Sequence, residues 1–187
     1  MKSLVLQKIY FARRMSSIGN NKIITLRYDS PCGQIMLGAH GGRICLCDWI
    51  SGKHRPRTCE KLKRFLHAEF EEEESAVIEL AKAALNRYFS GDRISFELPL
   101  LFVGTDFQEE VWKALLDIPY GATMSYGELA RKIGRPKAVR AVANANGANP
   151  ISIFVPCHRV IGSDGSLTGY GGGLDVKEYL LRLEKGL

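Results

Sequence analysis

Short hydrophobic runs separated by turn residues fill the first third of the chain. Runs of this length, with glycine- or proline-containing turns between them, are typical of antiparallel strands in sequence order. The runs and the turns that divide them occupy 23–26, 30–33, 35–37, 41–42 and 44–47. The pattern therefore predicts a three-stranded antiparallel sheet.

Hydrophobic positions then recur at helical spacing in two segments. The first begins near Thr58, and the second spans 75–89 and is closed by Gly91. The acidic run at 69–74 between them predicts a solvated helix end and loop. The expected apolar faces consist of Leu62, Phe65, Leu66, Val77, Leu80, Ala81, Ala84, Leu85 and Tyr88. Nothing in this part indicates chemistry, so we interpret it as a scaffold.

Capping boxes, in which Ser or Thr is followed three residues later by Glu or Gln, mark helix starts at 105–108 and 125–128. The second box opens a short helix that reaches about Ile133. Gly-Arg-Pro at 134–136 breaks this helix, and 137–145 is expected to form the next one. Two short helices across a glycine-containing turn are typical of a helix-turn-helix.

These elements predict a mixed α/β (α+β) chain in three parts. Residues 1–21 form a basic extension, 22–101 a scaffold domain, and 102–187 a second domain with the candidate chemistry. The last helix should start at Asp175, with Glu178 completing its cap.

Charge is distributed unevenly. The net charge is +6, and residues 1–28 hold six basic residues and no acidic one. The extension is compatible with a flexible arm, a DNA-contacting tail, a mitochondrial transit peptide or an upstream start, since Met15 could also begin the protein. The segment 123–162 holds six basic residues, and Glu128 is its single acidic residue. That surplus predicts a surface that contacts phosphates.

The five cysteines are odd in number and sparse, and no secretory signal precedes them. We expect a reducing compartment, the cytoplasm or, in a eukaryote, the nucleus, and no membrane association. Cys45 and Cys47, with His40 and His54 nearby, raise a zinc alternative. Their spacing matches no standard finger, and we expect the two cysteines to share one face of a strand. We therefore predict no metal and no cofactor.

Cys157 is the candidate nucleophile. It follows Pro156, which stiffens the approach, and precedes His158 and Arg159, whose positive charge should favour the thiolate. Acting through a bridging water, His158 would serve as the base, and Glu184 would orient it. The alternative is that Cys157 is a small buried hydrophobic residue.

The segment 169–173 (Gly-Tyr-Gly-Gly-Gly) is too short and differently spaced for a phosphate-binding fingerprint. It predicts a tight loop that a flat aromatic ligand, such as a nucleobase, can approach closely. Tyr170 would form an aromatic wall of that pocket.

The sequence Pro-Cys-His-Arg-Val at 156–160 resembles the acceptor motif of the O6-alkylguanine-DNA alkyltransferases, also called methylated-DNA–protein-cysteine methyltransferases. The similarity covers the chain from Phe102 to its end, and the N-terminal half matches in outline. Further matching stretches are 125–130, 140–142, 149–150, 172–174 and 177–178.

The resemblance implies a fold and an activity. The N-terminal half would be a ribonuclease-H-like three-stranded antiparallel sheet with helices, and the C-terminal half a winged-helix-like helical domain bearing Cys157. The protein, as a monomer, would bind double-stranded DNA that contains O6-alkylguanine and flip the base out. Cys157 would accept the methyl or larger alkyl group irreversibly, in a single turnover. We expect O4-alkylthymine to be a substrate as well.

The resemblance also implies roles for other residues. Tyr126 would donate a hydrogen bond to the flipped base, and Arg140 would fill the space that the base leaves. Asn149 would brace the turn before the acceptor segment. The remaining implied residues are Val155 and Val160, whose carbonyls would read the exocyclic amine, Tyr170 and Gly171 in the pocket, and Ser125 and Ala141 at the DNA.

Gly171 stands where some family members carry serine, which predicts a roomier pocket that tolerates alkyl groups bulkier than methyl. The structural zinc ligands of eukaryotic members are not evident. Two other functions remain open. A non-catalytic lesion binder would lack Cys157, whereas a cysteine hydrolase would turn over repeatedly and would not need Arg140.

Overall fold

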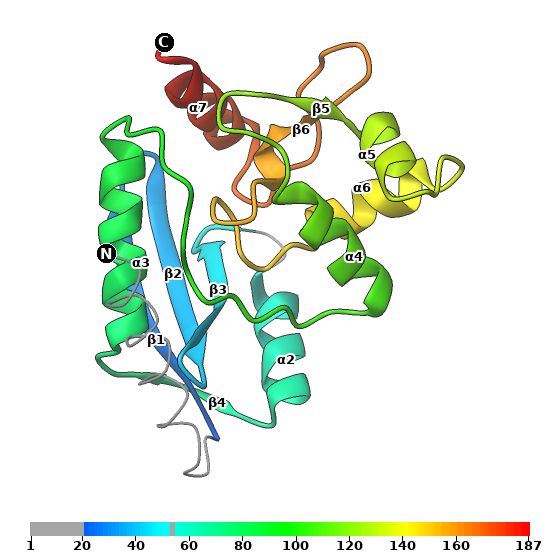
Figure 1. Ribbon diagram of the computed structural model, residues 1–187. Helices are drawn as coiled ribbons and strands as arrows, with labels where there is room; N and C mark the ends of the chain where they lie inside the picture. The colour runs from blue at the N-terminus through cyan, green and yellow to red at the C-terminus, as the bar shows by residue number, and fades with distance from the viewer. Residues whose placement is uncertain (1–20, 53–54) are drawn as a thin grey trace, which may run out of the picture.

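The computed structural model describes residues 21–52 and 55–187. The predicted basic extension, apart from Asn21, and residues 53–54 of the basic loop lie outside the described residues. Figure 1 shows a sheet flanked by helices and joined to a second part built mainly of helices. The elements are β1 (Lys22–Ser30), β2 (Gly33–His40), β3 (Arg43–Trp49), α2 (Arg55–Leu66), β4 (Glu69–Glu72), α3 (Ala76–Phe89), α4 (Asp106–Leu115), β5 (Met124–Ser125), α5 (Tyr126–Lys132), α6 (Val139–Gly147), the 3-10 turn η1 (Cys157–Arg159), β6 (Val160–Ile161) and α7 (Leu174–Lys185).

The N-terminal sheet has four strands in the order β3-β2-β1-β4. The antiparallel meander of β1, β2 and β3 is confirmed. The predicted loop at 69–74 is wrong in part, because 69–72 forms β4 and pairs parallel to β1. Lys22 holds two of the acidic side chains, Glu71 at 2.7 Å and Glu73 at 2.8 Å. Charged side chains suit an edge strand, since they discourage pairing with another chain.

A β-bulge in β3 shows that the prediction of Cys45 and Cys47 on one face of a strand is wrong. Gly38 pairs with Leu46 and Ala39 with Ile44, so Cys45 is an extra residue in the ladder. A bulge reverses the alternation of side chains beyond it. Cys45 therefore packs into a different hydrophobic core from Cys47. The two thiols do not share a face, which removes the geometry that the zinc alternative needs.

Among the described residues, α2 and α3 cover the N-terminal sheet. Helix α3 contributes buried residues to the larger core, and α2 contributes Leu62 to the smaller one. Helix α2 includes Arg55 and so starts earlier than predicted. The predicted apolar faces were too wide, because Phe65 is 50% and Leu80 57% exposed. A helix buries only the stripe that meets its neighbour.

Both predicted capping boxes are confirmed, with Thr105 capping α4 and Ser125 capping α5. The predicted cap at Asp175 and Glu178 is wrong. The N-cap of α7 is Gly173, which has a φ of 97° and makes no side-chain cap. Across the described ranges, no helix has the length and hydrophobicity needed to span a membrane.

The C-terminal part is joined to the sheet along the edge of β3. The backbone N–H of Cys47 donates to the Pro150 carbonyl at 2.9 Å, and the N–H of Ser152 donates to the Cys47 carbonyl at 2.7 Å. A second bridge pairs Ile44 with Leu100. The segment that leads to Cys157 is thus held by backbone hydrogen bonds to the N-terminal sheet. The N-terminal sheet therefore sets the position of Cys157.

Candidate acceptor-cysteine site

Cys157 begins the 3-10 turn η1 and is only 4% exposed. Its N–H donates to the Val155 carbonyl at 2.8 Å, and its own carbonyl accepts from Asn146 Nδ2 at 3.3 Å. Just upstream, the buried residue Ile153 has a φ of 70°, which is rare for a β-branched side chain. Such a conformation persists only where the surrounding structure enforces it. The segment before the cysteine is therefore tightly held.

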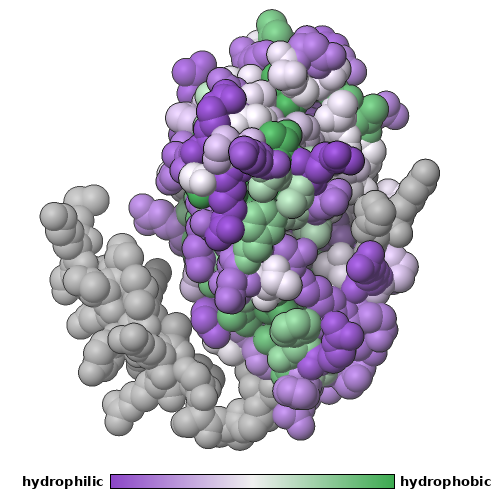
Figure 2. Space-filling view, turned by 90° about the vertical axis from the view of Figure 1, so that its right-hand side faces the viewer, coloured by the Kyte–Doolittle hydropathy of each residue, from purple (hydrophilic) through white to green (hydrophobic). Residues whose placement is uncertain are grey.

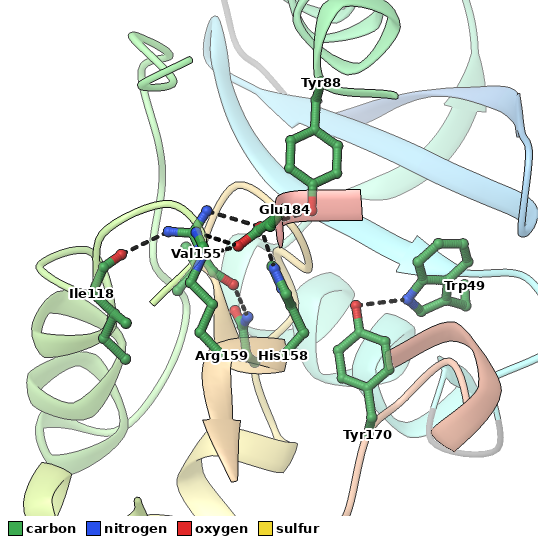
Figure 3. Close-up of polar contacts among 10 residues, drawn as sticks. Trp49, Tyr88, Ile118, Val155, His158, Arg159, Tyr170 and Glu184 are labelled. Atoms are coloured by element: carbon green, nitrogen blue, oxygen red, sulfur yellow. Dashed lines mark hydrogen bonds and ion pairs between the residues drawn. The ribbon is translucent and has the colours of Figure 1, made fainter. Parts of the chain in front are cut away.

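The buried carboxylate of Glu184 collects hydrogen bonds from both halves of the chain (Figure 3). Its Oε1 accepts from Tyr88 Oη at 2.8 Å, His158 Nε2 at 2.7 Å and Arg159 Nη2 at 2.9 Å. Its Oε2 accepts from Arg159 Nε at 2.8 Å and from the Gly121 N–H at 3.0 Å. Burial alone would raise the pKa of Glu184, but the hydrogen bonds from His158 and Arg159 and the charge of Arg159 outweigh burial and hold it well below its usual range.

This carboxylate fixes the tautomer of His158. Burial lowers the pKa of His158, although Glu184 opposes that effect, so the imidazole is neutral near pH 7. Because Glu184 is ionised, Nε2 must carry the proton that is donated to it. The other nitrogen, Nδ1, is then an acceptor, and it is buried with no hydrogen-bond partner among the described residues. His158 therefore has a free site on which to accept a proton.

The Cys157 thiol is protonated at rest. Burial raises its pKa to about 11, while a hydrogen bond from Asn149 and the charge of Lys177 lower it less. The prediction that Arg159 favours the thiolate is wrong, because its guanidinium is bound to Glu184 and, through Nη1, to the Ile118 carbonyl at 2.6 Å. Thiolate formation thus depends on transfer of the proton to a base.

A narrow pocket that is partly open to solvent lies beside Cys157. The C-terminal half contributes Tyr170 and Gly171 to its lining, as predicted. The N-terminal half, interpreted from the sequence as scaffold, contributes Asp48 and Arg55 to the same lining. Sheet and helical domain form the pocket together.

The aromatic wall and the brace lie at the pocket. Trp49 Nε1 donates to Tyr170 Oη at 3.2 Å, and the Tyr170 ring lies 6.4 Å from that of His158. Asn149 Oδ1 accepts from the Ile151 N–H at 3.0 Å, and its Nδ2 donates to the Val155 carbonyl at 2.9 Å. These contacts tie the chain after α6 to the acceptor segment.

The two carbonyls expected to read an exocyclic amine already accept hydrogen bonds. The Val155 carbonyl accepts from both Asn149 and the Cys157 N–H, which engages both lone pairs. The Val160 carbonyl accepts from Lys177 Nζ at 2.6 Å. Of the two, Val160 has the greater remaining capacity for a ligand.

Tyr126 lies near the pocket but is not part of its lining. Pairing of β5 with β6 brings it next to the acceptor segment. Its hydroxyl donates to the Thr168 carbonyl at 3.2 Å, and burial raises its pKa. Lys177 Nζ lies 6.0 Å from the centre of the Tyr126 ring and also donates to Thr168 at 2.7 Å.

The remaining predicted residues lie on the helix pair. Arg140 and Ala141 are exposed in the first turn of α6, and Ser125 is half-buried at the start of α5. Figure 2 shows the face of the molecule that includes this part, where hydrophobic residues gather in strips bordered by hydrophilic ones. Arg140 is thus free to contact a partner that approaches α6.

Sequence reasoning missed three residues of the site. Tyr88 lies on the apolar face of α3, and only its hydroxyl hinted at a polar target. Asp48 follows the buried run 44–47, where a charged residue contradicts the strand pattern. Lys177 matched the family pattern, but nothing in its spacing predicted that its ammonium would be buried.

The sequence matches two family descriptions in succession. Residues 24–102 match the ribonuclease-like domain of 6-O-methylguanine DNA methyltransferase, and residues 106–186 match its DNA binding domain. The methylated-DNA–protein-cysteine methyltransferase of Methanosarcina barkeri is 48% identical over 160 residues, which cover 84% of this chain and 94% of that protein. Its counterpart in Mycobacterium tuberculosis is 46% identical over 157 residues, 84% of this chain and 89% of that protein.

Solved structures of proteins from the same family match this fold. The crystal structure of the Mycobacterium tuberculosis O6-methylguanine methyltransferase has a TM-score of 0.75 at 45% identity, and covers 88% of this chain and 93% of that chain. A structure of the same protein in complex with DNA has a TM-score of 0.74 with the same coverage. With both domains, the acceptor motif and the fold matched, this chain belongs to the methylated-DNA–protein-cysteine methyltransferase family.

Proposed function

We propose that this protein repairs duplex DNA by moving an alkyl group from O6 of guanine to its own Cys157. Family membership and the DNA-bound relative support this function. The observation that carries it is the arrangement behind Cys157. His158 is neutral, oriented by Glu184 and left with a free acceptor nitrogen, next to a buried thiol that opens on a pocket.

The reaction is a displacement at the alkyl carbon. His158 Nδ1, through a water, takes the thiol proton, and the resulting thiolate attacks the carbon bonded to O6. The new S–C bond forms as the C–O6 bond breaks, and the bonding electrons pass to the guanine ring. Guanine then takes up one proton at N1, which balances the proton lost by the thiol. The products are restored guanine and a thioether on Cys157.

Imidazolium formation is the step that the buried network assists. When Nδ1 accepts a proton, the positive charge lies beside the Glu184 carboxylate, 2.7 Å from Nε2. This attraction opposes the burial that otherwise disfavours a charged His158. Arg159 keeps the carboxylate ionised throughout.

The depth of Cys157 requires the target base to leave the helix. A thiol that is 4% exposed cannot reach O6 of a stacked guanine, so the nucleotide must rotate into the pocket. We assign Arg140 to the space that the base leaves, and α6 with Ala141 to the minor groove. Tyr126 would exchange its bond to Thr168 for one to the base, where negative charge grows during the reaction.

The same site suits O4-alkylthymine, which presents a comparable alkoxy group on a flat ring. The reaction inactivates the protein after one turnover, because no neighbouring group displaces the alkyl group from the Cys157 thioether.

All five cysteines are free thiols, which fits a reducing compartment such as the cytoplasm or a eukaryotic nucleus.

The test counts lesions removed. Limiting protein is incubated with excess duplex that contains one O6-methylguanine, and the DNA is digested and analysed by chromatography. We expect one lesion removed per protein molecule and none with Cys157→Ser. Repeated turnover would instead support a cysteine hydrolase. Lesion binding without removal would make the protein a damage sensor.

A further inference from the structure

Asp48 is a buried carboxyl group that the proposed reaction does not use. It is 7% exposed at the end of β3 and lines the same pocket as Cys157. Its Oδ1 accepts from the Trp49 N–H at 2.9 Å. In the described part of the chain, no side chain donates a hydrogen bond to it. Arg55 is near, but its Nη1 donates to the Ile50 carbonyl at 3.4 Å and its Nη2 to Met36 Sδ at 3.2 Å.

Asp48 lines the pocket together with Gly171 and Cys157. A Cβ built on Gly171 would lie 3.7 Å from Asp48 Oδ1, so a ligand atom at that position contacts the carboxylate. The charge of Asp48 also raises the pKa of the Cys157 thiol, although burial raises it more. An alkyl group on O6 must have its first carbon at the sulfur, so its outer atoms enter this space.

We propose that Asp48 selects the alkyl group that Cys157 accepts. It favours neutral groups that carry a hydrogen-bond donor, such as 2-hydroxyethyl or carbamoylmethyl, and it disfavours the anionic carboxymethyl group. This inference rests on the proposed function and names the class of substrate that the site prefers.

The physical reason is the desolvation of Asp48. A buried carboxylate without a side-chain donor gains a charge-assisted hydrogen bond from a substrate hydroxyl or amide. The carboxylate of a carboxymethyl group at the same place would be repelled by Asp48, and this repulsion discriminates against the anionic substrate. Carbamoylmethyl and carboxymethyl are nearly equal in size, so the pair isolates charge from volume.

The test measures single-turnover transfer from duplexes with O6-methyl-, O6-carbamoylmethyl- or O6-carboxymethylguanine. The readout is the ratio of the carbamoylmethyl rate to the carboxymethyl rate within each protein, which cancels any change in thiol reactivity. We expect Asp48→Asn to lower this ratio about tenfold. Asp29→Asn, the same change at an exposed strand residue, should leave the ratio as in the unmodified protein. An unchanged ratio in Asp48→Asn overturns the proposal.

A second measurement needs no variant. Burial raises the pKa of Asp48 to about 6, although the Trp49 N–H and the charge of Arg55 lower it. The charged or titratable groups around it are Arg55, Cys47, Cys59 and Cys157. Between pH 8 and pH 5 Asp48 loses its charge, so the ratio in the unmodified protein should fall. A ratio independent of pH contradicts the proposal. Methyl transfer reports separately on the proposed function, because its absence would overturn that function itself.

Discussion

The two sides of Cys157 differ in how their polar atoms are satisfied. Behind the cysteine, both oxygens of Glu184 are fully engaged, by Tyr88, His158, Arg159 and the Gly121 backbone. In the pocket lining, two buried atoms have no hydrogen-bond partner among the described residues, Asn146 Oδ1 and Arg55 Nε. Two more such atoms lie outside the lining, His158 Nδ1 and Tyr120 Oη, whose ring is stacked against Arg159.

The contrast separates positioning from binding. A saturated buried carboxylate is costly to disturb, so it fixes the direction of the imidazole. Unpaired polar atoms at a pocket gain free energy when a polar ligand supplies their partners. The protein therefore holds the His158 imidazole rigidly through Glu184, and it leaves Asn146 Oδ1 and Arg55 Nε available to a polar ligand in the pocket.

The largest effect is expected on the saturated side. Glu184→Gln leaves the buried Arg159 without its counter-ion, which should lower the free energy of unfolding by about 3–5 kcal/mol. It should also slow alkyl transfer, because the imidazole loses its orienting charge. Urea denaturation and single-turnover assays measure both effects. The control is Glu110→Gln, which alters only an exposed ion pair with Arg135.

Acid should weaken the same network in two steps. The pKa of His158 is lowered in the folded protein, so the unfolded chain binds the proton first and stability starts to fall below about pH 6.5. The pKa of Glu184 is depressed, so its contribution is complete above about pH 4.3 and is lost as the pH falls further. Urea denaturation from pH 7 to pH 3 measures this. Glu184→Gln should lack the second step, and a profile identical to that of the unmodified protein would contradict the assignment.

Alkylation of Cys157 should destabilise the protein, because it forces extra atoms into a site where the sulfur is already buried. Overpacking of this kind costs about 1–3 kcal/mol. Melting temperatures of the methylated and unmodified forms, measured by calorimetry, provide the comparison. Equal melting temperatures would show that the pocket side accommodates the product without strain.

Tyr88→Phe tests whether the N-terminal half belongs to the site. It removes one of the donors to Glu184 and should lower stability by about 1–2 kcal/mol while slowing transfer several-fold. Tyr28→Phe is the matched control, since it also removes one phenol hydrogen bond, to Asn86 at 2.8 Å, away from Glu184. Transfer rates that fall equally in both variants would point to a general effect on folding.

The smallest effect is expected at Gly171. A serine side chain has room there, because its Cβ would meet only Asp48 Oδ1 at 3.7 Å. Gly171→Ser should leave stability nearly unchanged but slow the reaction with O6-benzylguanine, measured by competition against a methylated duplex. Absence of any reaction of the unmodified protein with O6-benzylguanine would refute the roomier pocket.

Local signals predicted much of this fold, and long-range contacts account for the failures. The capping boxes at Thr105 and Ser125 are complete within four residues, so the sequence alone was sufficient. Strand β4 forms through its pairing with β1, 47 positions earlier in the chain. Its sequence is mostly glutamate, so it lacks the hydrophobic alternation from which a strand is predicted. The bulge at Cys45 depends on Gly38, since a Cβ there would lie 2.8 Å from that of Leu46.

The same distinction holds for the site. The link between His158 and Glu184 was predicted from residue types, because a nucleophilic thiol needs a base and a group that orients the base, and the structure joins the two side chains at 2.7 Å. Arg159 was expected to activate the thiol, yet it serves Glu184, a partner that only the packing of α7 reveals. Asp48 and Tyr88 come from the other half of the chain, and no local pattern connects them to Cys157.

If the proposed function is right, Cys157 alone receives the alkyl group. Peptide mapping by mass spectrometry, after reaction with a duplex containing O6-methylguanine, locates the transferred group. We expect a gain of one methyl group on the peptide with Cys157 and none on those with Cys32, Cys45, Cys47 or Cys59. Methyl groups on another cysteine, or lesion loss that leaves every cysteine unmodified, would contradict it.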